Sequence, residues 1–224
     1  LTRDSDDEAL ITFTSGSTGA PKGANRTHGF LMAQYTALRQ SLPDFEGQIE
    51  IQSFPVVALH NIGCGVTTVM PAVDLATPAA IEPQVLLHQI SKWNANSIGA
   101  APAFLERVAD YAVENSISVP TMKRCFTGGA PVSVELCAKL LKIFPGVSGY
   151  AVYGSTEAEP MAKAKFEEVV EFAGKGDGFL AGRVAPVAEI AVARFTQEPP
   201  QLGNDGMAPY KQAQGELGEI VVRG

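Results

Sequence analysis

Short runs of apolar, largely branched residues alternate with longer segments of helical periodicity from residue 9 to residue 154. Each apolar run predicts a strand, and the segment that follows it is long enough to return over a sheet as a helix. The alternation therefore predicts an α/β fold with a mainly parallel sheet flanked by helices, a fold that binds ligands beyond the carboxyl ends of its strands. The expected strands span 9–14, 49–54, 73–77, 97–102, 122–128 and 147–154, and the expected helices span 27–41, 61–70, 83–93, 103–115 and 133–143.

The pattern changes after Tyr153. Residues 163–178 are rich in charge and end in GKGDG, which predicts a mobile loop. Two apolar runs, 188–195 and 215–224, are then separated by a polar segment, as expected for antiparallel strands. The sequence thus predicts an α/β subdomain over residues 1–178 and the start of a β-rich subdomain over residues 179–224.

Composition limits the classes of function. With 46% hydrophobic and 18% charged residues, the 224-residue chain is expected to be a soluble globular protein, and its net charge of −7 argues against nucleic acid or an anionic membrane as a partner. The cysteines Cys64, Cys125 and Cys137 are odd in number and widely spaced, which indicates neither a disulfide framework nor a zinc site. No apolar stretch reaches the length of a membrane span and the first residues are acidic, so we expect a cytoplasmic protein.

The string TSGSTGAPKG, residues 14–23, follows the first expected strand. Its glycines allow backbone conformations that point several N–H groups at one centre. Ser15, Ser17 and Thr18 add hydroxyl donors and Lys22 adds a positive charge, which together suit a polyphosphate. The alternative is a flexible Gly/Ser linker, although linkers seldom lie between a buried strand and an amphipathic helix.

This loop differs from the two most common phosphate-binding patterns. A Walker loop needs Gly-Lys-Ser/Thr leading straight into a helix, whereas here Pro21 precedes the lysine and Gly23 follows it. The string also lacks the Gly-x-Gly-x-x-Gly spacing of dinucleotide-binding folds. A polyphosphate site of another type is therefore expected.

Two glycines, Gly128 and Gly129, close the expected strand at 122–128. Ser133 is placed to cap the next helix. A plain turn would explain this segment, but glycines at the end of a strand also let a flat ring approach the backbone closely.

The string YAVYGSTEAEP, residues 150–160, puts an aromatic residue, a glycine, hydroxyls and carboxylates at the end of another strand. Its simplest interpretation is a capping box formed by Thr156 and Glu159. Pro160 argues against a helix here, because its missing N–H falls where the helical ladder should start.

The three strings closely resemble the signature motifs of the adenylate-forming (AMP-binding) superfamily, which includes acyl- and aryl-CoA synthetases, nonribosomal peptide adenylation domains and firefly luciferase. The resemblance implies that the loop binds the β- and γ-phosphates of ATP and that the Gly-Gly segment forms one wall of an adenine pocket. It also implies that Tyr153 stacks on adenine, Thr156 contacts the α-phosphate and Glu157 holds Mg²⁺. The implied catalytic residues are Lys22, Thr156 and Glu157, and the implied ATP-binding residues are Thr14, Ser15, Gly16, Ser17, Thr18, Gly19, Lys22, Gly128, Gly129, Ala130, Pro131, Tyr153, Gly154, Ser155 and Thr156.

The segment FPVVALHNIGCG, residues 54–65, resembles the family's Pro-x-x-His-x-x-Gly region near the acyl pocket. His60 lies five residues after Pro55, however, whereas the common acyl-CoA synthetase form has three. His60 is thus a candidate substrate residue, with an ordinary histidine at the start of a helix as the alternative.

The resemblance implies an ATP-dependent ligase that converts a carboxylic acid, expected to be fatty acyl, into an acyl-adenylate and pyrophosphate. A fatty acyl-CoA ligase, which would also use CoA, is the first expectation. The spacing Pro-x-x-x-Leu-x-Asn and the string YGSTEAEP resemble the olefin β-lactone synthetases, which act on β-hydroxy fatty acids without CoA. A non-catalytic nucleotide-binding module is the third alternative.

Several of the superfamily's later elements are expected to follow residue 224: the ribose-binding aspartate, the hinge and the C-terminal lid domain with its lysine. The upstream part of the N-terminal domain is also expected to be missing. The chain is therefore expected to be a fragment that is inactive or nearly so in isolation.

Overall fold

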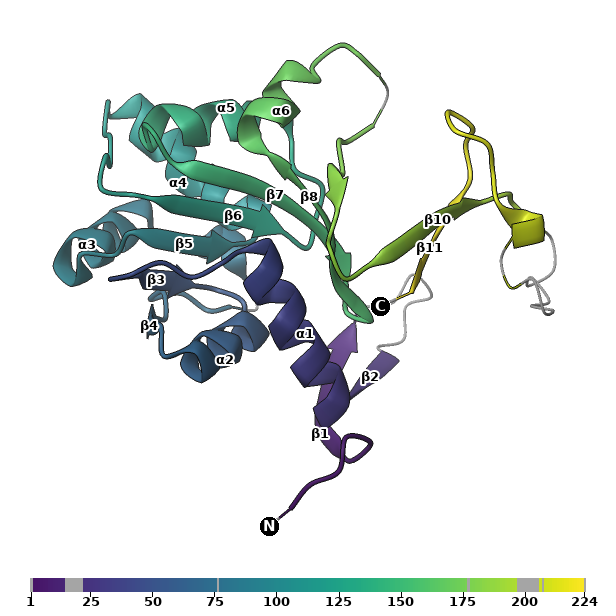
Figure 1. Ribbon diagram of the computed structural model, residues 1–224. Coiled ribbons are helices and arrows are strands. Elements are labelled where there is room, and N and C mark those ends of the chain that lie inside the picture. Colours follow the sequence, from purple (N-terminus) through teal and green to yellow (C-terminus); the bar gives the residue numbers. More distant parts are fainter. Residues whose placement is uncertain are drawn as a thin grey trace.

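The computed structural model describes residues 2–14, 22–75, 77–176, 178–196, 206 and 208–223. Its centre is a seven-stranded sheet in the order β4-β3-β5-β6-β7-β8-β9 (Figure 1). The pairs from β4 to β7 are parallel, and β8 and β9 add antiparallel pairs at one edge. The strands are β3 (Ile49–Gln52), β4 (Thr67–Val69), β5 (Ser97–Ala100), β6 (Arg124–Gly128), β7 (Ser148–Ser155), β8 (Ala158–Lys165) and β9 (Arg183–Val184). The predicted α/β fold with a mainly parallel sheet is confirmed.

Helices cover both faces of this sheet (Figure 1). α3, α4, α5 and α6 pack against one another on one face, whereas α1 and α2 lie on the other, with α1 against β8. Their bounds are α1 (His28–Ser41), α2 (Pro55–Cys64), α3 (Pro83–Trp93), α4 (Pro102–Glu114), α5 (Val134–Ile143) and α6 (Phe166–Glu171), and two short 3₁₀ helices span Pro78–Ala80 and Ala208–Tyr210. None of the described helices combines the length and the apolarity needed to cross a lipid bilayer.

The larger core lies between the sheet and the α3–α6 layer. Phe104, Phe144 and Phe166 are fully buried there, together with most of the inward side chains of α4 and α5. A smaller core under α2 contains Val57 and Phe126. Burial of these apolar side chains is the main source of stability for the sheet.

Local sequence explains where the helices begin. Proline is the first residue of α2, α3 and α4, where its fixed φ suits a helix and its missing N–H costs nothing. Thr27 caps α1 by accepting the Phe30 N–H, and Ser133 caps α5 by accepting the Leu136 N–H, as predicted for Ser133.

Two predicted elements around α2 are wrong. The helix expected at 61–70 begins at Pro55 and ends at Cys64, because Gly65 adopts φ +73° and terminates it. Thr67–Val69 then forms β4, parallel to β3, in place of the strand expected at 73–77. Periodicity alone indicates the later start, whereas Pro55 marks the first residue of the helix.

The expected strand at 9–14 does not join the main sheet. β1 (Glu8–Thr14) pairs with β2 (Lys22–Thr27), a strand that the sequence did not predict, in an antiparallel hairpin that leads into α1. A polar KGANRT segment carries little strand signal of its own, and pairing with β1 decides its conformation.

The charged segment 163–178 is also more ordered than predicted. β8 continues to Lys165 and α6 follows directly. Met161, Ala162, Ala164 and Phe166 are buried, so an apolar pattern underlies the charges. A Cβ on Gly149 would lie 2.0 Å from Phe166 Cδ2, which shows how closely this ring covers the sheet.

After this segment, β9 still belongs to the main sheet, and β10 (Glu189–Ala193) pairs with β11 (Glu219–Arg223) in the predicted antiparallel arrangement. The β10–β11 hairpin projects from the β8–β9 edge (Figure 1). The division into subdomains at residues 178 and 179 stays a prediction.

Candidate nucleotide-binding site

Two of the three predicted ATP-binding segments line the same cleft. Gly129, Ala130 and Pro131, which follow β6, and Tyr153 and Gly154, near the end of β7, surround a space of about 370 Å³. This volume falls in the range of about 300–1,000 Å³ that is usual for small-molecule sites. The cleft lies at the carboxyl ends of adjacent parallel strands, where the fold predicts a ligand.

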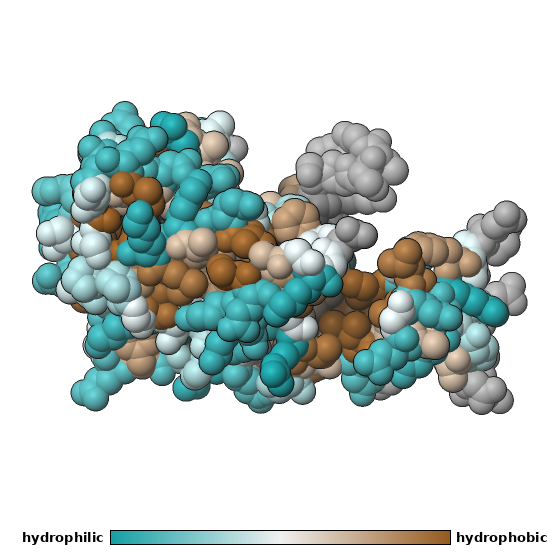
Figure 2. Space-filling model, turned by 90° about the horizontal axis from the view of Figure 1, so that it is seen from above, coloured by the Kyte–Doolittle hydropathy of each residue, from teal (hydrophilic) through white to brown (hydrophobic). Residues whose placement is uncertain are grey.

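Part of the cleft lining comes from segments that sequence reasoning did not assign to the site. Phe179, Leu180, Ala181 and Ile220 also line it. In Figure 2, hydrophobic side chains gather between the main body and the β10–β11 hairpin. The sequence carries no local sign that these residues line the cleft. In the folded chain, the 62% exposure of the apolar Phe179 side chain marks it as a residue that a ligand could contact.

The two glycines have different physical roles. Gly128 lies where β6 approaches β7, and a Cβ there would lie 2.4 Å from the Val152 carbonyl oxygen. Gly129 has φ +78°, and the space around its would-be Cβ is open except for Phe54 at 3.9 Å. The first glycine is thus required by strand packing and the second by the turn.

Thr156 and Glu157 form the two-residue turn between β7 and β8. The capping-box interpretation is therefore wrong, because a strand rather than a helix begins after Thr156. Tyr153 is 38% exposed beside the cleft, and Glu157 is exposed at the tip of the turn. Ser155 and Thr156 are half-buried. An aromatic face and a carboxylate are thus available on one hairpin.

A buried arginine holds this turn against the β1–β2 hairpin. Arg26 in β2 is 4% exposed; one of its terminal nitrogens donates to the Thr156 carbonyl at 3.0 Å and the other donates to Gln34 Oε1 at 3.1 Å. Gln34 in turn donates to Glu159 Oε2 at 3.4 Å. The sequence reasoning missed Arg26, because the polar KGANRT segment gives no local sign that this arginine is buried.

The charged groups of this network, the Arg26 guanidinium and the Glu159 carboxylate, are only partly solvated. Burial lowers the pKa of the Arg26 guanidinium, and the carboxylates of Glu159 and Glu157 oppose that shift. Burial likewise raises the pKa of Glu159, and Arg26 partly offsets it. Arg26 and Glu159 therefore each favour the charged form of the other.

The phosphate loop can be placed only by its ends. Thr14 of β1 is paired with Lys22 of β2, so the loop is closed at its base by a strand pair. Ser15, Gly16, Ser17, Thr18 and Gly19 lie outside the described residues, and only the backbone of Thr14 and Lys22 is described.

His60 lies in the middle of α2 and faces α1, which makes the expectation of a histidine at the start of the helix wrong. It lines an apolar pocket of about 180 Å³ between the two helices, with Leu31, Tyr35 and Leu59 among its neighbours. The rings of His60 and Tyr35 are 5.2 Å apart, centre to centre. Burial lowers the pKa of His60, and the nearby carboxylates of Asp44 and Glu50 oppose that shift.

The same histidine belongs to a second cluster that the sequence reasoning did not find. Asp44, His60 and Cys64 offer donor atoms that all lie within 4.8 Å of one another. His60 Nε2 is 3.4 Å from Cys64 Sγ. Burial raises the pKa of the Cys64 thiol, and the Asp44 carboxylate adds to that shift. The signal was the His-x-x-x-Cys spacing, which puts both side chains on one helix face.

The chain resembles proteins of known activity along its whole length. The olefin beta-lactone synthetase of Xanthomonas campestris pv. campestris is 29% identical over 228 residues, which cover 98% of this chain and 39% of that protein. The long-chain-fatty-acid–CoA ligase of Bacillus subtilis (strain 168) is 27% identical over 225 residues, covering 97% of this chain and 36% of that protein. The chain thus spans well under half the length of these relatives.

The fold has solved counterparts as well. The o-succinylbenzoate coenzyme A synthetase of Bacillus subtilis, in complex with ATP and magnesium ion, matches with a TM-score of 0.74 at 22% identity, over 99% of this chain and 42% of that one. The profile of the AMP-binding enzyme family matches residues 2–224. The three motifs, the cleft that two of them share and this match lead to one conclusion: the chain belongs to the AMP-binding, adenylate-forming enzyme family.

Proposed function

We propose that this chain is the nucleotide-binding part of an enzyme that activates a carboxylic acid with ATP, releasing pyrophosphate and forming an acyl-adenylate. The observation that carries the proposal is the cleft shared by Gly129–Pro131 and Tyr153–Gly154. The Thr156–Glu157 turn lies at the end of the same strand and is tied by Arg26 to the strand that begins at Lys22.

The residues around the cleft fit ATP. The half-exposed ring of Tyr153 offers a face for stacking, and Gly129 leaves the backbone open to a flat base. Ser15, Gly16, Ser17, Thr18, Gly19 and Lys22 would hold the β- and γ-phosphates through N–H groups, hydroxyls and a positive charge.

Glu157 fits a magnesium ligand. Its carboxylate is exposed, and Mg²⁺ prefers oxygen ligands from one or two carboxylates together with phosphates and water. When bound, Mg²⁺ would neutralise phosphate charge during the reaction. Thr156, its neighbour in the turn, would donate a hydrogen bond from its hydroxyl group to an α-phosphate oxygen.

The reaction balances with these groups alone. A carboxylate oxygen of the acid forms a bond to the α-phosphorus, and the bond from that phosphorus to the bridging oxygen breaks. Pyrophosphate leaves with the electron pair, and no proton needs to move. The task of the chain is to bring two anions together, which Lys22 and the loop N–H groups favour by stabilising charge on the departing pyrophosphate.

The apolar pocket between α1 and α2 is the proposed site for the acid. Its lining includes Leu31, Met32, Leu38 and Leu59, which suits an alkyl or aryl chain. Gln34 lines the same pocket and hydrogen-bonds to Glu159 beyond the turn, so the pocket borders the proposed phosphate region. His60, the candidate substrate residue, lines this pocket.

Two fates of the adenylate are proposed. A fatty acyl-CoA ligase would transfer the acyl group to CoA, and the relative in Bacillus subtilis supports this fate. A β-lactone synthetase would instead close a ring within a β-hydroxy acid, and the identity of 29% to the Xanthomonas protein supports this second fate. The product formed from a β-hydroxy fatty acid and ATP, with and without CoA, separates the two.

ATP–pyrophosphate exchange in the enzyme that carries this chain tests the activation step. Lys22→Ala and Glu157→Gln should each lower exchange at least 100-fold, because loss of one group that stabilises transition-state charge costs about 10²–10³-fold. The matched controls Lys142→Ala and Glu114→Gln alter exposed residues of α5 and α4 and should leave exchange unchanged. Full exchange in both Lys22→Ala and Glu157→Gln would refute the proposed roles.

A further inference from the structure

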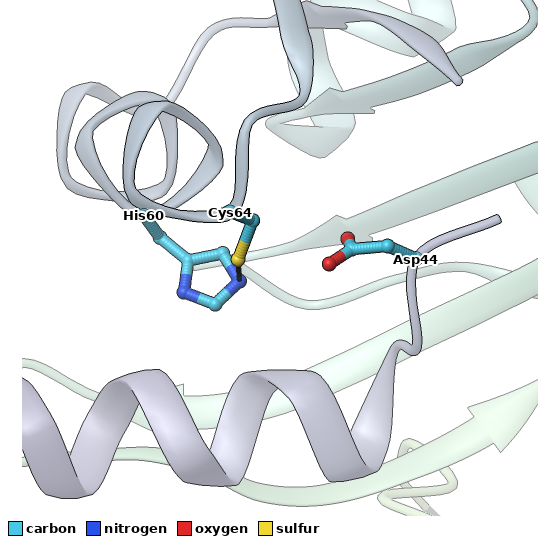
Figure 3. Close-up of side chains that lie close together, drawn as sticks. All are labelled: Asp44, His60 and Cys64. Carbon is cyan, nitrogen blue, oxygen red and sulfur yellow. Dashed lines mark hydrogen bonds between the residues drawn. The ribbon is translucent and has the colours of Figure 1, made fainter. Parts of the chain in front are cut away.

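We propose that Asp44, His60 and Cys64 form a zinc-binding site that joins the loop after α1 to helix α2. Figure 3 shows the three side chains directed toward a common space, with His60 and Cys64 on one face of α2 and Asp44 opposite them. The inference does not depend on the proposed adenylation activity, because metal binding is measured directly, although His60 also lines the pocket proposed for the acid.

The spacing of the donors fits a tetrahedral zinc ion. Zinc–sulfur bonds of about 2.3 Å and zinc–nitrogen bonds of about 2.0–2.1 Å at the tetrahedral angle place the two donor atoms about 3.5–3.6 Å apart. The observed distance between His60 Nε2 and Cys64 Sγ is 3.4 Å. The helix therefore holds two ligands at nearly the separation that zinc requires.

Asp44 supplies the third ligand from a different element. Its carboxylate lies within 4.8 Å of both helix donors, and it is half-buried on the short connection between α1 and β3. Three protein ligands leave a fourth position for water, a pattern that zinc commonly adopts.

The donor set selects the type of metal. Sulfur and imidazole nitrogen favour zinc over Mg²⁺ and Ca²⁺, which prefer oxygen ligands alone. A thiolate and a carboxylate balance the two positive charges of zinc, and the neutral imidazole adds none. The proposed zinc ligands thus include sulfur and nitrogen, whereas Glu157, the proposed magnesium ligand of the nucleotide-binding site, offers only carboxylate oxygens.

Neighbouring side chains hold the ligands in place. Arg39 Nε lies 3.9 Å from Asp44 Oδ2, and Arg39 also donates to the Tyr35 hydroxyl at 3.1 Å. Tyr35 in turn packs its ring against His60. Outer partners of this kind orient metal ligands and contribute to affinity. They come from α1, so a bound metal would connect α1, its following loop and α2.

Titration of the metal-free chain with Co²⁺ alone tests the site. One equivalent should produce visible bands of tetrahedral cobalt and a sulfur-to-cobalt charge-transfer band, and Zn²⁺ should displace both. Cys64→Ser should abolish the charge-transfer band. His60→Gln and Asp44→Asn should each raise the Kd for zinc by at least about 10–100-fold, because loss of a residue that merely supports a metal ligand already has an effect of that size. The exposed His88 provides the control: His88→Gln should bind as the unaltered chain does.

A second measurement needs no substitution, so it holds even if a variant fails to fold. Zinc should slow alkylation of Cys64 in the unaltered chain at least ten-fold, as followed by mass spectrometry of the peptide that contains it. The proposal is overturned if no charge-transfer band forms, if the band persists in Cys64→Ser, or if zinc leaves the alkylation rate of Cys64 unchanged.

Discussion

A terminal nitrogen of Arg26 donates to the backbone carbonyl oxygen of Thr156 at 3.0 Å, across 130 positions of sequence. This bond joins the strand that begins at Lys22 to the turn that carries Glu157. Arg26 thus sets the distance between two motifs that are proposed to act on different phosphates of one nucleotide. Arg26 also donates to Gln34 Oε1, and because Gln34 belongs to α1, this helix is part of the same hydrogen-bond network.

Replacing Arg26 should therefore affect both stability and activity. Arg26→Met removes hydrogen bonds made by a buried charged group, each worth about 1.5–3 kcal/mol, and leaves the half-buried Glu159 carboxylate without its cation. We expect a loss of about 2–4 kcal/mol in the free energy of unfolding by urea denaturation, and exchange lowered more than ten-fold under conditions where the protein remains folded.

The double variant Arg26→Met/Glu159→Gln is the control for this prediction. Because the uncompensated carboxylate is removed, it should recover part of the stability but not the exchange activity, since the Thr156 carbonyl still lacks its donor. Recovery of both would show that Arg26 serves folding alone.

Tyr153 should matter for ATP binding and little for folding. Its ring is 38% exposed beside the cleft. Tyr153→Ala is expected to raise the KM for ATP about ten-fold, since base–aromatic stacking is worth about 1–3 kcal/mol, and to change kcat little. Tyr153→Phe keeps the ring and should behave nearly as the unaltered protein. Equal KM values for the Ala and Phe variants would contradict stacking.

Gly149 should be intolerant of any side chain. A Cβ there would lie 2.0 Å from the buried ring of Phe166, so the ring or β7 must move. Gly149→Ala is expected to cost about 1–3 kcal/mol, the usual effect of overpacking a core. Gly63 in α2 is the matched control, because its would-be Cβ lies 3.9 Å from the nearest atom, Tyr35 Cε2. Gly63→Ala should instead stabilise by about 0.5–1 kcal/mol, and both changes can be read from denaturation midpoints.

A buried ion pair between side chains of β3 and β6 predicts a third effect on stability. Arg124 donates to Glu50 at 2.8 Å, and Ser97, Gln48 and Asn61 also donate to this carboxylate. Arg124→Met leaves the buried Glu50 charge without its cation and should cost about 3–5 kcal/mol.

The control for the ion pair is Arg124→Met/Glu50→Gln, which removes both charges and should cost clearly less. If it is as unstable as Arg124→Met in urea, the loss comes from packing rather than from the unpaired charge.

The strand–helix alternation predicted the parallel sheet because its central strands, β5 and β6, are buried at every position and so leave a strong local signal. β2 was missed because KGANRT is polar and becomes a strand only by pairing with β1. The motif strings located Gly129 and Tyr153, but Phe179 and Ile220 entered the cleft through chain packing that no local pattern records. Arg26 and the Asp44 cluster likewise depend on contacts between distant segments.

The three cysteines should differ sharply in reactivity. Cys125 and Cys137 have no exposed surface, whereas Cys64 is half-buried at the end of α2. Burial raises the pKa of the Cys137 thiol to about 12, and burial also raises that of Cys125. The thiolate is the reactive form, so both thiols should resist a thiol reagent in the folded protein even at a pH of about 9, while Cys64 reacts.

The same shifts predict how stability depends on pH. A group whose pKa is higher in the folded state stabilises the fold fully at a pH below its unfolded value, 9.0 for Cys137, and this contribution is lost as the pH rises toward about 12. Cys137→Ala removes that dependence, so its urea midpoint should fall less steeply over this range than that of the unaltered protein. For the reactivity of the three cysteines, rapid labelling of one thiol in the folded protein and of three thiols in denaturant would support the prediction. Rapid labelling of Cys125 or Cys137 in the folded protein would contradict it.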